Sequence, residues 1–186
     1  MIVSFSGAQS TGKTTLLNKI RGLNPFGIEY VDEVTRRIKR DFNLPINESG
    51  GDLTQTMIMS DHIANVYRKG DHDVTVLDRC AVDGVVYTQW LKQQDQVKEG
   101  TYLTAVNVFN DLISKYDIIF YTSPEDVPLE DDGERSINVK FRDEIIHLFK
   151  IYMSNLDNVI TLRGTVEERL ITIKNTLALH NIDINI

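Results

Sequence analysis

Residues 7–14 read Gly-Ala-Gln-Ser-Thr-Gly-Lys-Thr, and this short stretch constrains the fold more than any other part of the chain. It satisfies the pattern of Gly, any four residues and then Gly-Lys-Thr, whose glycines let backbone amides wrap around phosphate oxygens. The apolar run Ile2–Phe5 leads directly into it, and Leu16, Leu17 and Ile20 follow at helical spacing. The sequence therefore predicts a strand, a phosphate-binding loop and a helix in direct succession.

The residue types in this loop predict how a nucleotide would be held. Lys13 is expected to reach the β- and γ-phosphates of ATP, and the Thr14 hydroxyl is the expected Mg²⁺ ligand. The alternative is a glycine-containing turn between strand and helix with an exposed lysine. The predicted nucleotide-binding residues are Gly7, Ala8, Gln9, Ser10, Thr11, Gly12, Lys13, Thr14 and Thr15.

Composition narrows the class of protein further. The chain has 186 residues, of which 41% are hydrophobic, so we expect one domain over residues 1–186 with a core of its own. Cys80 is the single cysteine and has no internal disulfide partner. Because we find neither a leader-like segment nor an apolar run long enough for a bilayer, we expect a cytoplasmic protein that does not insert into membranes. A net charge of -7 counts against nonspecific binding to nucleic acid.

Short apolar runs recur along the chain and alternate with longer segments of helical character. The runs are Ile2–Ser6, Ile28–Val31, Val74–Leu77, Ile118–Tyr121 and Val159–Leu162. They lack clean alternation of apolar and polar residues, which is typical of strands buried on both faces. Strands that alternate with helices favour an α/β fold with a five-stranded parallel sheet, whose carboxyl edge binds the ligands.

Two of the intervening segments carry clear helix signals. The first is predicted over Asp52–Lys69, where Asp52 and Gln55 have the spacing of a capping box. The second has an apolar stripe at helical spacing, formed by Phe141, Ile145, Leu148, Phe149 and Tyr152. Both are features of a packed scaffold.

The third apolar run ends at Asp78-Arg79, which places a carboxylate and a guanidinium at the predicted ligand edge. Asp78 is the candidate second Mg²⁺ ligand, in the position of a Walker B acid. Enzymes that activate water for ATP hydrolysis commonly carry a second acid next, whereas this chain has Arg79, which suits a phosphoryl group in transfer. The alternative is a local ion pair at a strand end.

The second run is followed by Glu33-Val34-Thr35-Arg36, in which Glu33 and Arg36 lie about one helical turn apart. At the start of a helix beside the phosphate loop, Glu33 could accept a proton from an acceptor hydroxyl or bind that hydroxyl. The alternative is an acid that complements the helix dipole, followed by a solvated basic face. That basic face would consist of Arg36, Arg37, Lys39 and Arg40.

Other chemically interesting residues favour structural roles. The four histidines do not have the spacing of zinc ligands. Cys80 fits a small buried residue that begins a helix better than it fits a nucleophile. Tyr87, Trp90 and Leu91 lie at helical spacing, which normally means core packing, although an aromatic ring could also stack on an acceptor base.

Together these motifs resemble those of the NadR-like AAA-ATPase-type kinase family, which includes nicotinamide riboside kinase domains and related phage proteins. The resemblance extends in order from Gly7 to about Tyr152. The matching segments are the phosphate loop, Glu33–Arg36, Asp78-Arg79 with Asp83 and Tyr87, Asp132–Arg135, and Phe141–Ile145. Two departures from the family pattern limit the resemblance: we expect no counterpart of the adenylyltransferase domain that accompanies the kinase in NadR, and Thr35 and Arg37 make the second-strand helix more polar than usual in the family.

The resemblance implies a P-loop NTPase sandwich of three layers with strand order 2-3-1-4-5. It also implies a mobile lid near residues 123–142 that brings arginines to the phosphates, with Arg135 and Arg142 at the matching positions. Arginines in such a lid would act as internal arginine fingers and exclude water.

The leading functional hypothesis is a kinase that transfers the γ-phosphoryl group of ATP·Mg²⁺ to a nucleoside or nucleotide. The predicted catalytic residues are Lys13, Glu33, Asp78, Arg79, Arg135 and Arg142, and the predicted substrate-binding residues are Glu33, Arg36, Asp78, Arg79, Asp83 and Tyr87. Glu33 is the candidate base and Asp78 the alternative. A kinase acting on a modified base or 5′ end of DNA stays open, as does a nucleotide-hydrolysing switch that binds a partner protein, although no guanine-reading Asn-Lys-x-Asp motif stands at a suitable position.

Overall fold

The computed structural model of the chain describes residues 1–23, 27–68, 70, 72–125 and 138–184. Its strands are β1 (Ile2–Ser6), β2 (Ile28–Val31), β3 (Val74–Asp78), β4 (Ile118–Thr122) and β5 (Val159–Leu162). Its helices are α1 (Lys13–Gly22), α2 (Val34–Phe42), α3 (Asp52–Tyr67), α4 (Ala81–Gln93), α5 (Glu99–Leu112), α6 (Val139–Met153) and α7 (Val166–Ala178), with short 3₁₀ turns at Asn47–Ser49 and Ile113–Lys115. No helix of the described residues is long and apolar enough to cross a bilayer.

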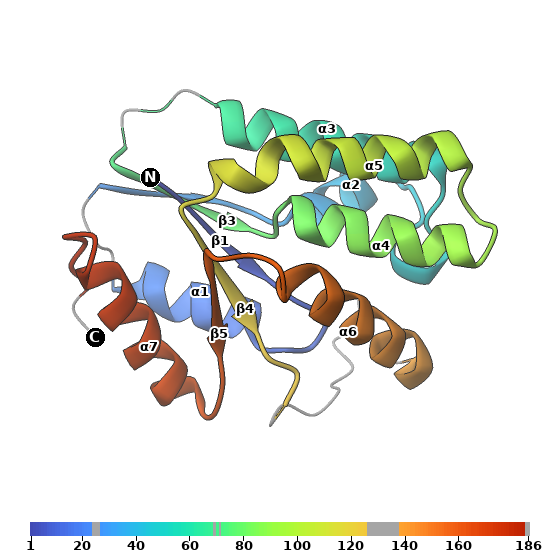
Figure 1. The fold of residues 1–186 in the computed structure, drawn as a ribbon. Helices are drawn as coiled ribbons and strands as arrows, with labels where there is room; N and C mark the ends of the chain where they lie inside the picture. The colour runs from blue at the N-terminus through green and yellow to red at the C-terminus, as the bar shows by residue number, and fades with distance from the viewer. Residues whose placement is uncertain (24–26, 69, 71, 126–137, 185–186) are drawn as a thin grey trace.

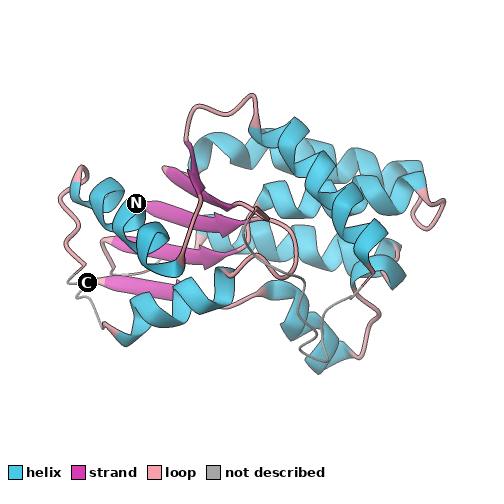
Figure 2. Ribbon diagram, turned by 90° about the horizontal axis from the view of Figure 1, so that it is seen from below, coloured by secondary structure: helices cyan, strands magenta, loops and turns pink. Residues whose placement is uncertain are grey.

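The five strands form one parallel sheet in the order β2-β3-β1-β4-β5, which confirms the predicted fold class and strand order. Figure 2 shows the strand arrows running in the same direction, so their carboxyl ends gather at one edge. Two strands extend one residue beyond the predicted apolar runs, to Asp78 in β3 and Thr122 in β4. Both added residues lie at the edge where the phosphate loop leaves β1.

Helices cover both faces of the sheet and bury two separate apolar clusters (Figure 1). Strand β4 contributes to both, because Ile119 and Tyr121 pack with helices α3 to α6, whereas Ile118 and Phe120 pack with α1 and α7. This burial on both faces explains why the strand sequences lack alternation.

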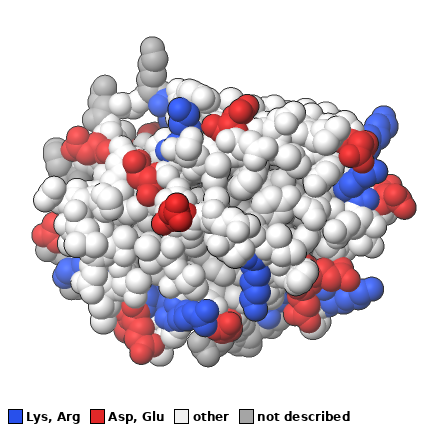
Figure 3. All heavy atoms as spheres, in the orientation of Figure 1, with Lys and Arg blue, Asp and Glu red and all other residues white. Residues whose placement is uncertain are grey.

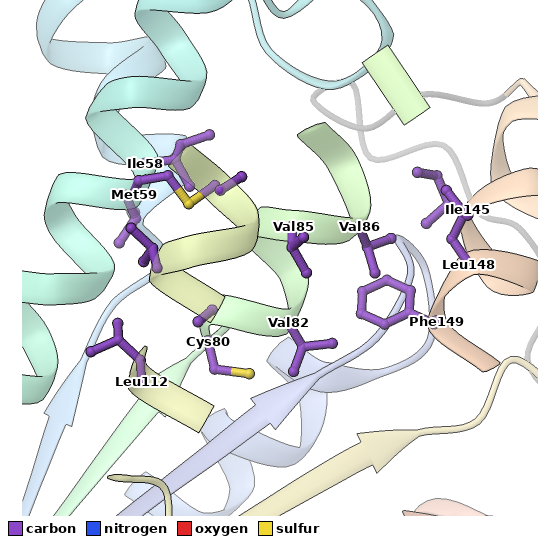
Figure 4. Packing of buried hydrophobic residues seen from close by; sticks show 14 of the residues in the cluster. Ile58, Met59, Cys80, Val82, Val85, Val86, Leu112, Ile145, Leu148 and Phe149 are labelled. Carbon is purple, nitrogen blue, oxygen red and sulfur yellow. The ribbon is translucent and has the colours of Figure 1, made fainter. Parts of the chain in front are cut away.

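Helix α4 lies at the centre of the larger cluster. Its residues Val82, Val85 and Val86 are fully buried, and Figure 4 shows them between Met59 of α3 and Phe149 of α6. Trp90 also packs inward, with its ring centroid 4.5 Å from that of Phe141. This arrangement confirms the predicted core packing of the α4 and α6 stripes.

The predicted capping box at Asp52 is wrong. Helix α3 does begin at Asp52, but Gly51 is its N-cap residue, and no side-chain cap is formed there. The Asp52 carboxylate instead accepts hydrogen bonds from the Lys98 amide at 2.9 Å and from the Thr101 hydroxyl at 2.5 Å, so it holds the start of α5. The helix also ends at Tyr67, short of the predicted Lys69.

Candidate active site

The phosphate loop leaves β1 after Ser6 and ends where α1 begins at Lys13. Both glycines of the loop, Gly7 and Gly12, adopt a positive φ, which a residue with a side chain rarely adopts. Gly12 is the N-cap of α1 with φ +85°, and Gly7 has φ +138°. A Cβ atom on Gly7 would lie 2.6 Å from the Thr122 hydroxyl oxygen and 2.9 Å from the Thr122 carbonyl oxygen. The loop therefore depends on close backbone approach to the end of β4.

Lys13 closes the phosphate loop upon itself. Its ammonium donates to the carbonyl oxygens of Gly7 and Ala8, both at 2.7 Å, and the side chain is buried. Burial, followed by the positive charge of Arg79, lowers the pKa of Lys13 to about 7. The ammonium thus lies inside the loop, where an anion would be a stronger partner than two carbonyl groups. Thr14 is half-buried in the first turn of α1, whereas Thr15 is exposed.

Asp78 ends β3 next to the phosphate loop. Its Oδ1 atom is buried and has no hydrogen-bond partner among the described residues. Burial and the negative charge of Glu33 raise the pKa of Asp78 to about 6. Asp78 and Thr14 line the same cavity of about 500 Å³. A buried carboxylate oxygen without a partner, beside a hydroxyl, fits the oxygen ligands that Mg²⁺ prefers.

Glu33 and Arg79 form a buried ion pair at the carboxyl edge of the sheet. Glu33 is the N-cap residue of α2, and its two carboxylate oxygens accept from Arg79 Nε at 2.6 Å and from Arg36 Nε at 3.0 Å. Burial alone would raise the pKa of Glu33, but the charge and hydrogen bond of Arg79 outweigh it and hold this pKa at about 2. Glu33 is therefore a carboxylate at neutral pH.

Arg79 is the centre of this network. Its Nη1 atom donates to Asp83 at 2.8 Å, and Asp83 in turn accepts from the Ser6 hydroxyl at 2.6 Å. Arg79 also has φ +80°, which is uncommon for a residue with a side chain and occurs at functional sites. The structure thus brings together Glu33, Arg36, Arg79 and Asp83, four of the residues that the sequence predicts to bind substrate.

Tyr87 connects the network to the phosphate loop. Its ring lies 5.5 Å from the Arg79 guanidinium carbon, and its hydroxyl donates to Gln9 Oε1 at 3.1 Å. The ring also packs edge-on against Phe141 and Phe149. Cys80, in contrast, begins α4 fully buried, and burial raises the pKa of its thiol to about 12, so the expectation of a packing role holds.

Two neighbouring cavities, which we call the outer and the inner cavity, lie beside Arg79. The outer cavity has a volume of about 240 Å³ and is lined in part by Gln9, Glu33 and Lys39. The inner cavity, of about 20 Å³, lies between α3 and α4 and is lined in part by Gln55 and His62. Arg79 and Asn47 line both cavities. Gln55, His62 and Asn47 were not predicted as site residues, because which side of α3 meets α4 depends on the packing.

The predicted lid lies partly outside the described residues. Arg142 of α6 donates from Nη2 to the carbonyl oxygen of Ser10 at 3.4 Å, so one predicted lid arginine does reach the phosphate loop. Helix α6 begins at Val139, with Asn138 as a side-chain cap. Arg135 lies outside the described residues, as does the acidic segment around it.

Arg169 of α7 is a buried arginine that sequence reasoning missed. It is 2% exposed and donates to the carbonyl oxygens of Thr11 at 2.8 Å, Ser123 at 3.2 Å and Glu125 at 3.3 Å. It therefore ties the phosphate loop to the segment that follows β4. A signal was present, because Arg169 interrupts the apolar face that Leu170 and Ile173 form on this helix.

The family comparison agrees with this geometry. A protein-family model described as an AAA domain matches residues 2–169, so the chain belongs to that family. The match runs from the first strand to Arg169 and includes the phosphate loop, Glu33 and Asp78. Among curated proteins, none matches the sequence significantly.

Solved structures show the same fold at low sequence identity. Deoxyadenosine kinase from M. mycoides with products dCMP and a flexible dCDP bound has a TM-score of 0.68 at 13% identity, with 97% of this chain and 100% of that chain covered. The NadR protein in complex with NR has a TM-score of 0.75 at 18% identity, with 100% of this chain but 53% of that chain covered. The chain thus spans about half of NadR and the whole of the smaller kinase. The family match and this fold confirm the predicted resemblance.

Proposed function

We propose that the protein is an ATP-dependent kinase that phosphorylates a hydroxyl group of a small nucleoside- or nucleotide-type acceptor. The observation that carries this proposal is the Glu33–Arg79–Asp83 network, which contacts the phosphate loop at Gly7 and lines the two cavities beside Arg79. A hydroxyl bound at Glu33 would have a carboxylate acceptor on one side and nucleotide phosphates on the other. The NadR and deoxyadenosine kinase structures, which hold NR, dCMP and dCDP, support an acceptor of this kind.

Nucleotide binding would begin with the release of Lys13 from the Gly7 and Ala8 carbonyls. The ammonium would then pair with the β- and γ-phosphates, and backbone amides at the start of α1 would face the same anion. Thr14 and Asp78 would hold Mg²⁺, which supplies charge neutralisation between these phosphates. Arg142 lies close enough to Ser10 to add a second cation from α6.

In the transfer step the acceptor oxygen forms a bond to the γ-phosphorus as the bond from that phosphorus to the β–γ bridging oxygen breaks. The hydroxyl proton passes to a carboxylate, and ADP leaves with the bridging oxygen. Glu33 is our candidate acceptor for this proton. With a pKa of about 2 it is a weak base, so we expect it mainly to orient the hydroxyl and to take the proton late.

A phosphate-transfer panel tests this function. The labelled γ-phosphate of ATP is offered to nucleosides, nucleoside monophosphates, nicotinamide riboside and oligonucleotides, with water as the reference acceptor. We expect transfer to a nucleoside or monophosphate well above release of inorganic phosphate. If ATP is hydrolysed equally fast with and without every acceptor, the protein is a hydrolase and the proposal fails.

A second candidate, a kinase acting on DNA, is favoured by one observation. The cavity of about 500 Å³ beside Thr14 is lined by Arg21, Arg36, Arg37, Arg40 and Arg68. Each of these arginines, however, already pairs with a carboxylate of the chain. The face shown in Figure 3 mixes acids and bases in the part that the described residues form, rather than presenting a basic track. A steep fall of acceptor affinity with added salt would favour DNA over a small molecule.

A further inference from the structure

The inner cavity has the dimensions of a single polar group. Its volume of about 20 Å³ holds roughly one water-sized atom group, far less than a purine or pyrimidine ring. Helix α3 contributes Gln55 and His62 to its wall, and α4 contributes Asp83 and Tyr87. Arg79 and Asn47 line both this cavity and the larger one lined by Glu33, so the two cavities are neighbours.

His62 is the feature of the inner cavity that points to a ligand. The side chain is 2% exposed, and its Nε2 atom has no hydrogen-bond partner among the described residues. Three other polar wall residues do have partners: Gln55 accepts from Thr88, Asp83 pairs with Arg79, and Tyr87 donates to Gln9. Because buried polar groups are nearly always hydrogen-bonded, an orphaned nitrogen that lines a cavity calls for a partner.

The position of the His62 ring is fixed by the close approach of α3 to α4. Gly84 of α4 faces it, and a Cβ atom there would lie 3.2 Å from His62 Cδ2 and 2.7 Å from Met59 Cε. The absence of a side chain at Gly84 thus gives the imidazole room on the side of α4 that lines the inner cavity. The ring is buried between the two helices, and a buried side chain loses little further freedom when a ligand binds, which favours selectivity.

The position of the inner cavity beside the outer one indicates which ligand it would meet. Arg79 and Asn47 line both cavities, and Glu33 lines the outer one. We propose that His62 is a specificity-determining residue whose Nε2 atom hydrogen-bonds one exocyclic amino or carbonyl group of the acceptor ring, inserted into the inner cavity while the reacting hydroxyl lies at Glu33. This inference rests on the proposed function, because it requires an acceptor with a polar ring.

The charge state of His62 suits this role. Burial lowers the pKa of His62 to about 4, with the charge of Arg79 adding to the effect and that of Asp83 opposing it. A neutral imidazole has one nitrogen that donates and one that accepts. The tautomer that is present decides whether Nε2 binds a carbonyl or an amino group, and neither tautomer introduces a buried charge.

Two pairs of acceptors test the inference. Deoxyadenosine and deoxyinosine differ at one ring position by amino against carbonyl, and deoxycytidine and deoxyuridine differ in the same way. We expect the wild-type protein to discriminate within at least one pair by about tenfold in kcat/KM, the effect of one hydrogen bond. In His62→Leu that ratio should fall below about threefold, chiefly through KM, whereas His62→Gln should retain part of it.

A structural readout separates recognition from a packing defect. In nitrogen-15 spectra of imidazole-labelled protein, the preferred nucleoside should shift Nε2 of His62 and leave the exposed His147 of α6 unchanged. Equal discrimination by wild type and His62→Leu, or an unmoved His62 signal at saturating nucleoside, overturns the inference while the kinase proposal stands. If none of the four nucleosides nor any other acceptor is phosphorylated, the proposed function fails and this inference fails with it.

Discussion

The two sides of the candidate active site are built in different ways. The phosphate side comes from one continuous stretch, Gly7 to Thr14, whose shape is held by backbone contacts and by Lys13 on its own carbonyls. The acceptor side is assembled from separate elements, with Glu33 before α2, Arg79 after β3, and His62 and Gln55 on α3. A local motif can specify the first, whereas only tertiary packing creates the second. Variants on the two sides should therefore fail in different ways.

Lys13→Ala is expected to have the largest effect, because it removes the cation that meets the nucleotide phosphates. Phosphate transfer should fall below detection. The thermal unfolding midpoint should change little, because the substitution removes hydrogen bonds within the loop and leaves the apolar core intact. The measurement is kcat with ATP and the acceptor found in the panel. Lys19→Ala, at an exposed position on the same helix, is the matched control. Activity near wild type in Lys13→Ala would remove the phosphate-loop assignment.

Arg142→Ala should come next, with kcat lowered about 10³-fold, the lower end of an arginine finger's contribution. The affinity for ATP without acceptor should change little, because Arg142 contacts the loop from α6 rather than forming it. Lys140→Ala serves as the comparison, because Lys140 is an exposed cation two residues earlier on the same helix. We expect the same loss of kcat in Arg135→Ala. Unchanged kcat in both arginine variants would exclude the lid from catalysis.

Glu33→Gln tests the acceptor side alone. Because a pKa of about 2 makes Glu33 a weak base, we expect a loss of about 10²-fold in kcat, at the low end for general bases, with ATP affinity nearly unchanged. Asp32→Asn is the control, since Asp32 is its exposed neighbour in sequence. An Asp78→Asn variant should weaken binding of ATP·Mg²⁺ as well. Equal losses in the two variants, with ATP affinity intact in both, would leave the proton acceptor unassigned.

The smallest effect concerns stability, and it arises from His62. Because the folded protein holds the His62 pKa at about 4, below its ordinary 6.5, the unfolded chain binds more protons between these values. The free energy of unfolding should therefore fall as the pH drops from about 6.5 to 4, by up to about 3 kcal/mol. Asp83 and Arg79 across the helix interface, and Asp61 on α3, are the charges that set this pKa.

Urea unfolding at several pH values measures this dependence. The slope should be flatter in His62→Gln, whereas His147→Gln on the exposed face of α6 should keep the wild-type slope. Identical slopes in the wild type and His62→Gln would show that His62 is not held neutral in the folded state.

The phosphate side could be predicted from the sequence more completely than the side assembled from separate elements. The strands were predicted to within one residue because apolar runs between polar loops are local signals, and the phosphate loop is a contiguous motif. The positions of Glu33 and Asp78 at the ligand edge could be predicted because strand ends in a parallel sheet meet at one edge. Asp52 was misread as a cap, since its carboxylate is used by a distant amide, that of Lys98.

The missed residues share a physical reason. His62 and Gln55 line the inner cavity only because of the way α3 packs against α4, which no spacing along the chain reports. Arg169 acts through carbonyl groups of residues more than forty positions away. The catalytic roles of Lys13, Glu33, Asp78, Arg79, Arg135 and Arg142 stay predictions that the variants above are designed to test.

Arg169 also sets an order of events during synthesis on the ribosome. The phosphate loop is translated before α7, yet the guanidinium that fixes the Thr11 carbonyl belongs to that later helix. A growing chain can pair the early strands, but its loop lacks this clamp until α7 has been translated and docked. We expect nucleotide to bind fully only once α7 has docked, so that it would not stabilise folding intermediates that form before this helix.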